Sequence, residues 1–187
     1  ERLGHPLRHF ALAPSAPYTV SDRSFERVAT LTGELDLPVH LHVHETLHEI
    51  VESQKLHGVR PLERLRRLGV VGPNLIAVHA VHLDDHEIAM LAANSCSVAH
   101  CPASNLKLGS GIARVAELAA AGVNVGIGTD GAASNNRLDL LGETRLAALL
   151  AKGASGDAAA LGAHAALRAT TLAGARTLGL DHEIGSL

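Results

Sequence analysis

The sequence is poor in aromatic residues, with two phenylalanines, one tyrosine and no tryptophan in 187 residues. Proteins that bind single-stranded nucleic acid stack the bases on such rings, so an open nucleic-acid groove is not expected. Positive charge is not in excess either, because the formal net charge is −3, and no basic surface is offered to a phosphate backbone. These two absences exclude nucleic acid as the expected partner.

Cysteine and long apolar runs are also scarce. Two cysteines, Cys96 and Cys101, are too few for a disulfide framework, which suits a reducing cytoplasmic location. No apolar run approaches the about 18 residues of a membrane span, and no charged segment followed by an apolar one opens the chain. We therefore expect a cytoplasmic protein with no membrane partner. Its oligomeric state stays open, with a homo-oligomer among the alternatives.

What the chain does have is a regular alternation of short apolar segments and amphipathic helices. Strands are predicted over residues 10–13, 37–44, 75–81, 96–100 and 123–128. Helices are predicted over about 22–36, 46–56, 62–68, 84–93, 112–121, 138–151 and 157–173. This order predicts an α/β fold with parallel strands and right-handed crossovers. An open doubly wound sheet and part of a closed barrel both fit, since a complete barrel takes about 250 residues.

Histidines and a carboxylate gather at the predicted strand ends. Residues 39–44 alternate histidine with aliphatic residues, so His40, His42 and His44 share one face of a strand. A half-exposed edge strand would show the same alternation, and it is the less favoured explanation of that segment. Successive strands, however, end in His42, His79, His100 and Asp130. Because parallel strands bring their carboxyl ends to one mouth, and imidazole with carboxylate ligates zinc or iron, a metal site is predicted there.

Two segments match known signatures in sequence, but their structural context does not fit. His44-Glu45-Thr46-Leu47-His48 reads as the HExxH of zinc proteases, but that motif needs both histidines on one helix, and here His44 completes a strand. Residues 126–131 read as GxGxxG, but Asp130 would lie beside a pyrophosphate and no acid follows about 20 residues on. We reject both interpretations.

Five stretches of the chain carry a family resemblance. They are Ala13–Tyr18, His42–Thr46, Val78–Leu83, His100–Leu108 and Gly128–Asn136. In their order and separation they resemble the amidohydrolase superfamily, and within it the 5-methylthioadenosine/S-adenosylhomocysteine deaminases of the chlorohydrolase/deaminase group. The resemblance implies that residues 1–187 are the C-terminal part of a metal-dependent hydrolase domain. That domain is a (β/α)₈ barrel, present here as about strands 4–8 without the first strands and the β-sandwich.

The resemblance also implies roles for individual residues. His42 would ligate the metal, Asp130 would ligate it and take a proton from water, and Glu45 would shuttle protons. His79 would orient the water or the developing oxyanion. One divalent metal is implied, zinc before iron, with two further histidine ligands expected upstream of this chain, where the family has a first-strand His-x-His. The expected pocket residues are Ser15 and Ser134, from the resemblance, and His44, from its strand face.

The implied activity is hydrolytic deamination of a purine nucleoside-type small molecule, such as 5-methylthioadenosine, S-adenosylhomocysteine or adenosine, with release of ammonia. Many family members carry histidine at the position of Ser15, and the shorter reach of serine leaves the choice of ring open. A sister enzyme that deaminates or dechlorinates guanine, a pterin or an s-triazine is the first alternative. A barrel that no longer catalyses and serves as a binding module is the more distant one.

Overall fold

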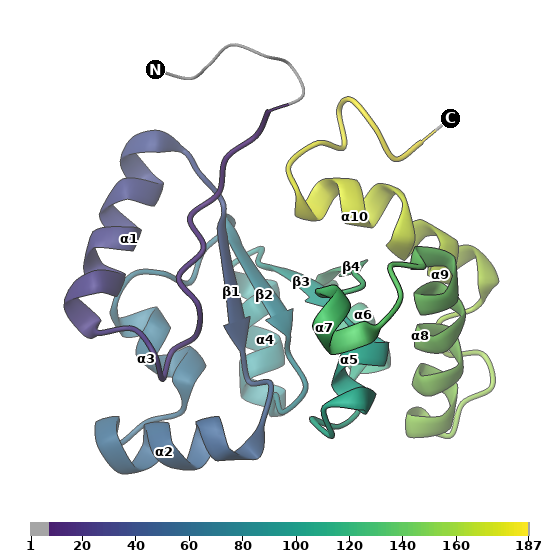
Figure 1. The fold of residues 1–187 in the computed structure, drawn as a ribbon, viewed down its shortest axis with the longest axis horizontal. Coiled ribbons are helices and arrows are strands. Elements are labelled where there is room, and N and C mark those ends of the chain that lie inside the picture. The colour runs from purple at the N-terminus through teal and green to yellow at the C-terminus, as the bar shows by residue number, and fades with distance from the viewer. Residues whose placement is uncertain (1–7, 187) are drawn as a thin grey trace.

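Four short parallel strands form the centre of the computed structural model, which describes residues 8–186 (Figure 1). They pair in chain order as β1 (Val39–Val43), β2 (Leu75–His79), β3 (Ser97–His100) and β4 (Asn124–Ile127). The register pairs Val43 with His79 and His100 with Ile127, so the strands end along one edge of the sheet. The predicted parallel α/β arrangement is confirmed.

Helices make up much of the remaining described chain. They are α1 (Asp22–Leu35), α2 (Leu47–His57), α3 (Pro61–Arg67), α4 (Asp85–Ala93), α5 (Pro102–Lys107), α6 (Val115–Ala120), α7 (Ala132–Asn135), α8 (Leu140–Ser155), α9 (Ala163–Thr170) and α10 (Leu172–Thr177). Their first residues follow local capping chemistry: Ser21 caps α1 and Asp84 caps α4, the latter through a reciprocal capping box with Glu87. None of the helices within residues 8–186 has the length and hydropathy that a membrane crossing requires.

Two predicted elements differ from the structure, and two short helices were not predicted. The segment 10–13 forms no strand, and only Leu12 of it pairs with Val39. The pairing stops there because Pro14, two residues after Leu12, has no N–H to extend the ladder. The helix predicted over 157–173 divides into α9 and α10 at Thr171. The short helices α5 and α7 lie in segments where no helix was predicted.

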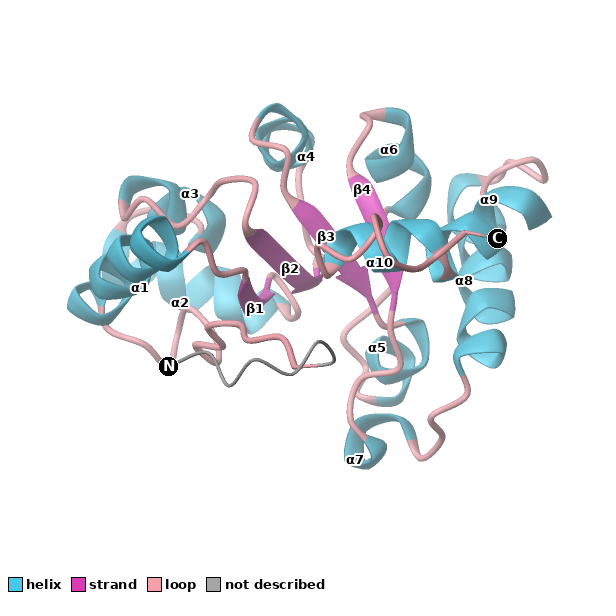
Figure 2. Ribbon diagram, turned by 90° about the horizontal axis from the view of Figure 1, so that it is seen from above, coloured by secondary structure: helices cyan, strands magenta, loops and turns pink. Residues whose placement is uncertain are grey.

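The two faces of the sheet have different surroundings. Val39, Leu41 and Val43 of β1 are buried in the main apolar core, whereas His40 and His42 point to the opposite face, as the alternation predicts. On that opposite face α10 crosses over β3 and β4, which Figure 2 shows from above. The approach of α10 is so close that a Cβ at Gly126 would lie 2.7 Å from the hydroxyl of Thr177. The face that carries the histidines is therefore partly covered by the C-terminal helices.

Candidate metal and catalytic site

His42 is oriented by the backbone at the end of β1. Its Nδ1 lies 2.6 Å from the carbonyl oxygen of Ser15, and its ring stacks on His79 with 5.4 Å between ring centroids and 19° between planes. A carbonyl oxygen can only accept a hydrogen bond, so Nδ1 carries the hydrogen. This leaves the lone pair on Nε2, and a backbone carbonyl behind the ring is the usual support of a metal-ligating histidine.

Glu45 follows β1 on a sharp turn and faces His79. The two backbone amides of His44 and Glu45 each donate to a carboxylate oxygen of buried Glu49, both at 3.0 Å. The Glu45 carboxylate then lies 3.8 Å from Nε2 of His79 and accepts a hydrogen bond of 3.3 Å from the Ser110 hydroxyl. Burial raises the pKa of Glu49 to about 7, although the amide hydrogen bonds act against it. The turn thus presents Glu45 to the imidazole of the next strand.

Asp130 follows β4 in a left-handed backbone conformation, with φ of 61°. Its carboxylate accepts hydrogen bonds of 2.6 Å from the Ser104 hydroxyl and 2.7 Å from the Gly131 amide. Burial acts to raise its pKa, but these hydrogen bonds and the nearby His79 and His42 outweigh burial and hold the pKa below its usual value. Asp130 is therefore an anion at neutral pH, as a metal-binding carboxylate must be.

A cavity of about 1140 Å³ lies on the histidine face of the sheet. Its polar lining includes Ser15, His40, His42 and Asp130, and its wall is completed by apolar residues from α8 to α10 and the segment after α10. The volume exceeds the roughly 300–1,000 Å³ of most small-molecule pockets. His79 lies behind the lining, buried and stacked against His42. One space thus reaches both the imidazole of β1 and the carboxylate after β4.

These residues fit part of a metal shell. Within residues 8–186 there is no group of three or more His, Cys, Asp or Glu side chains that could hold a metal ion. His42 and Asp130 do offer one imidazole nitrogen and one carboxylate to the same cavity, and both are donors that zinc takes. A four-coordinate ion needs further donors, so the described residues account for about half of such a shell.

His44 is not in the pocket, where the alternation of the strand predicted it. The strand ends at Val43, and His44 has a φ of 55°, which breaks the alternation and turns its ring the other way. The ring is fully buried: its Nδ1 lies 3.2 Å from the carbonyl oxygen of His82, and its Nε2 accepts from the Leu62 amide at 3.1 Å. Burial lowers the pKa of His44, so the ring is neutral. We correct its assignment from pocket residue to structural support.

The other predicted site residues lie as follows. Ser15 lines the cavity and supports His42 through its backbone carbonyl. Ser134 lies half-buried on α7 and is not among the residues that line the cavity. His48 is an exposed residue of α2, whereas His44 precedes that helix, so the two histidines of the HExxH match do not share a helix. The rejection of that motif is confirmed.

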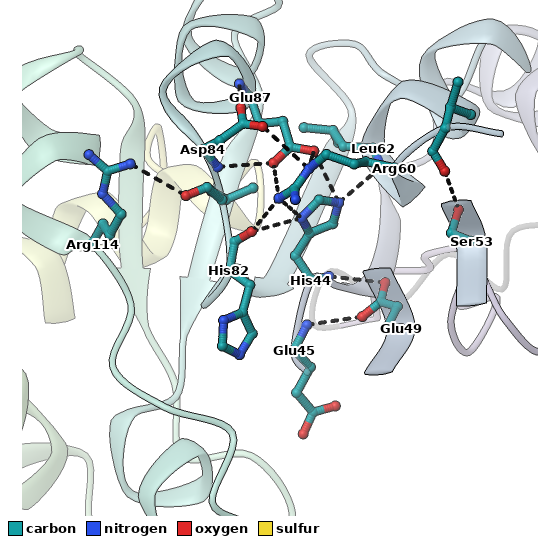
Figure 3. A network of polar contacts seen from close by, with 12 residues as sticks. His44, Glu45, Glu49, Ser53, Arg60, Leu62, His82, Asp84, Glu87 and Arg114 are labelled. Atoms are coloured by element: carbon teal, nitrogen blue, oxygen red, sulfur yellow. Dashed lines mark hydrogen bonds and ion pairs between the residues drawn. The ribbon is translucent and has the colours of Figure 1, made fainter. Parts of the chain in front are cut away.

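His44 belongs to a buried polar network that joins the ends of β1 and β2 (Figure 3). The guanidinium of Arg60 donates to both oxygens of Glu87, at 2.8 and 2.7 Å, and to the carbonyl oxygen of His82 at 2.6 Å. Glu87 also accepts from the Asp84 amide at 3.0 Å. Because His82 follows β2 and His44 follows β1, the network fixes both turns next to Glu45 and His79.

We expect Glu87→Ala to lower the free energy of unfolding by about 1–3 kcal/mol, the usual cost of leaving a buried polar group without its partner, because Arg60 keeps Asp84 at 3.3 Å. The reason is that Arg60, whose side chain is 27% exposed, loses both carboxylate oxygens of a partner that is 2% exposed. Urea unfolding followed by circular dichroism measures the change. The control is Glu117→Ala, which removes an exposed partner of Arg114 and costs less than about 1 kcal/mol. Equal losses in the two variants would contradict the buried role of Glu87.

Three hydroxyl and amide groups that support the site were not predicted. Ser104 holds Asp130, Asn105 lies 2.8 Å from Nδ1 of His79, and Ser110 holds Glu45. Two of them lie in the stretch His100–Leu108, which carries the family resemblance, so the signal was present without an assigned role. Their partners lie 26, 26 and 65 residues away along the chain, which no local pattern reveals.

Comparison with known proteins bears on the site. The family model described as the amidohydrolase family matches residues 6–187. The 5-methylthioadenosine/S-adenosylhomocysteine deaminase of Teredinibacter turnerae is 48% identical over 183 residues, which are 98% of this chain and 41% of that protein. The 5′-deoxyadenosine deaminase of Methanothermobacter thermautotrophicus is 47% identical, over 91% of this chain and 40% of that protein.

A solved structure is similar to this chain in both sequence and fold. The zinc-bound adenosine deaminase of Xanthomonas campestris is 54% identical and superposes with a TM-score of 0.97, over 98% of this chain and 42% of that one. The chain thus spans about two-fifths of the length of the relatives that it matches.

Proposed function

Because the chain belongs to the amidohydrolase family, we propose that it is part of an enzyme that deaminates the purine ring of an adenosine-type nucleoside. One observation carries the proposal: His42 and Asp130 line one cavity while Glu45 faces His79 beside it. The relatives named above support the substrate class, since they are deaminases of 5-methylthioadenosine, S-adenosylhomocysteine, 5′-deoxyadenosine and adenosine.

The proposal includes the architecture. We take residues 1–187 as the C-terminal part of a (β/α)₈ barrel domain, with the segment around Leu12 as its fourth strand and β1 to β4 as strands five to eight. Two features support this assignment. The strands are parallel and in chain order, and polar groups follow the carboxyl ends of β1, β2 and β4, which is where barrel enzymes carry their chemistry.

The proposed cofactor is one divalent metal, zinc before iron. Nε2 of His42 and the carboxylate of Asp130 would hold it, and two histidines outside this chain would complete the shell. The zinc bound to the Xanthomonas campestris enzyme supports this choice. Bound there, the metal would lower the pKa of a water molecule toward about 7 and so supply the nucleophile at neutral pH.

The residues of this chain would divide the proton transfers between them. Asp130, held ionised by Ser104 and Gly131, accepts the proton of the attacking water. Glu45 delivers a proton to the ring nitrogen next to the carbon that carries the amine, which makes that carbon electrophilic. His79 orients the attacking water. Water adds to the ring carbon, the proton that Asp130 accepted passes to the exocyclic amine, and the C–N bond breaks to release ammonia as the ring carbon becomes a carbonyl.

A substrate panel tests the proposal on the complete natural protein loaded with zinc. We expect ammonia release with the highest kcat/KM on adenosine, 5-methylthioadenosine or S-adenosylhomocysteine. A preference for guanine, a pterin or an s-triazine, with no turnover of nucleosides, would replace the proposal with the sister hydrolase. The atrazine chlorohydrolase of Arthrobacter aurescens, 32% identical to this chain with a TM-score of 0.87 over 41% of its length, makes that the alternative to include. Binding without any turnover would support the non-catalytic module.

The surroundings of the thiols agree with a reducing compartment, and we extend the proposal to a cytoplasmic location. Cys96 and Cys101 are both free and buried. Burial raises the pKa of Cys96 to about 11 and that of Cys101 to about 12, so neither thiol is a nucleophile at neutral pH. The proposed partner is the small-molecule substrate alone, without nucleic acid or membrane.

A further inference from the structure

Asn105 occupies an unusual place for an amide side chain. It lies on the short helix α5, is 1% exposed, and its Oδ1 lies 2.8 Å from Nδ1 of His79. Its other polar atom, Nδ2, is buried without a hydrogen-bond partner among residues 8–186. An unpaired buried donor costs free energy, so stability alone would favour an apolar side chain here. The retained contact to His79 points to a role in the site.

We propose that Asn105 is a positioning residue that fixes the proton of His79 on Nδ1. The inference rests on the proposed function for its catalytic consequence. The amide oxygen only accepts hydrogen bonds, so it favours the tautomer with hydrogen on Nδ1. Nε2 then carries the lone pair and faces the Glu45 carboxylate at 3.8 Å. The lone pair of Nε2 and the Glu45 carboxylate thus face one another, and the reacting groups of a substrate would meet both.

The backbone of Asn105 holds the second partner of this pair. Its carbonyl oxygen accepts a 2.8 Å hydrogen bond from the amide of Ser110, and the Ser110 hydroxyl donates to Glu45 at 3.3 Å. One residue of α5 is thus connected to His79 through its side chain and to Glu45 through its neighbour. His79 itself has a φ of 72°, a strained conformation that needs support from its surroundings.

His100, which lies next to His79, does not replace Asn105 as the hydrogen-bond partner of the His79 ring. Burial lowers the pKa of His100 to about 4, with repulsion from His79 adding to the effect. His100 is therefore neutral beside His79, and its own Nδ1 has no hydrogen-bond partner among residues 8–186. Within the described chain, the only hydrogen bond of the His79 ring is the one that Asn105 Oδ1 accepts. The position of the proton on His79 therefore depends on this amide.

The direct test is the tautomer of His79 in the complete, zinc-loaded protein. ¹⁵N shifts of labelled histidine, assigned by comparison with a His79→Gln variant, report which ring nitrogen carries hydrogen. We expect hydrogen on Nδ1 in the wild type. In Asn105→Leu, which has similar size and no acceptor, we expect a mixture of tautomers. In Asn105→Asp, which restores an acceptor, we expect hydrogen on Nδ1 again.

Kinetics provide the second readout. Asn105→Leu should lower kcat by about 10–100-fold, the usual effect of losing a group that orients a site residue, and change KM by less than about threefold. Asn105→Asp should recover most of kcat. The control Asn94→Leu removes an amide that bonds the Met90 carbonyl away from the site, and should leave kcat unchanged.

Two results would overturn the inference: hydrogen on Nε2 in the wild type, or shifts that stay the same in all Asn105 variants. If Asn105→Leu does not fold, Asn105→Ala, which also lacks an acceptor, takes its place. Absence of ammonia release from every nucleoside would instead count against the proposed function, since the ¹⁵N shifts are measured without substrate.

Discussion

Glu45→Gln is expected to lower kcat by about 10²–10⁴-fold, the range that general acid–base help contributes. Glutamine keeps the size of the side chain and can still accept from Ser110, but it cannot release a proton to a ring nitrogen. The metal content should be unchanged, because the imidazole of His42 and the carboxylate of Asp130 are untouched. Steady-state ammonia release, with zinc measured in the same samples, checks both expectations.

The matched control for this change is Glu52→Gln on α2, seven residues further along the chain. Glu52 pairs with exposed Lys55, so its replacement should leave kcat within about twofold. Turnover near the wild-type rate in Glu45→Gln would remove Glu45 from the mechanism. A loss of zinc in that variant would instead assign it to the metal shell.

Strand periodicity is the feature of the sequence that predicted part of the candidate site. His42 lies two residues from His40 on a strand whose other residues are buried aliphatics, and period-two alternation places both imidazoles on one face. The same reasoning placed His79 at the end of β2 and Asp130 just after β4, because parallel strands end along one edge. The helices α1 and α4 begin close to where the sequence predicts them, at the caps Ser21 and Asp84.

The turn after β1 lay outside this reasoning. His44 was predicted in the pocket because alternation was extended one residue too far, into a residue with a left-handed backbone. No glycine marks the turn, so the sequence contains no signal for the positive φ. The turn is held by Glu49 and the Leu62 amide, contacts between segments that periodicity does not connect. The orientation of His44 thus depends on tertiary packing.

The supporting groups were missed for a related reason. Ser110 and Glu45 are 65 residues apart, and Asn105 and His79 are 26 apart, so each pair meets only once the sheet has formed. Serine and asparagine are also common in loops, so their presence there predicts turns and helix caps more readily than a functional site. Residue type identified the groups that we propose for the chemistry, and only the structure identified the groups that contact them.

His42→Ala is expected to reduce the zinc affinity of the complete protein by more than about 100-fold. Loss of a group that only hydrogen-bonds to a metal ligand costs about 10–100-fold, and this change removes the ligand itself. The change removes a donor atom itself, the Nε2 that the Ser15 carbonyl leaves free by fixing hydrogen on Nδ1. Zinc per chain after dialysis, and competition with a chelator, measure the loss. Deamination should fall with zinc content, and excess zinc should restore it only in part.

His48→Ala is the control that separates this site from the HExxH match. His48 is exposed on α2. It would be a zinc ligand only if His44-Glu45-Thr46-Leu47-His48 were a protease motif. We expect His48→Ala to retain all of its zinc and His42→Ala to lose it, because His42 lines the cavity that Asp130 also lines. Retention of zinc by His42→Ala, or its loss from His48→Ala, would mean that the metal is held by a different set of residues. Since Asp130 is ionised by its own hydrogen bonds, Asp130→Asn should lose zinc together with His42→Ala if both bind the same ion.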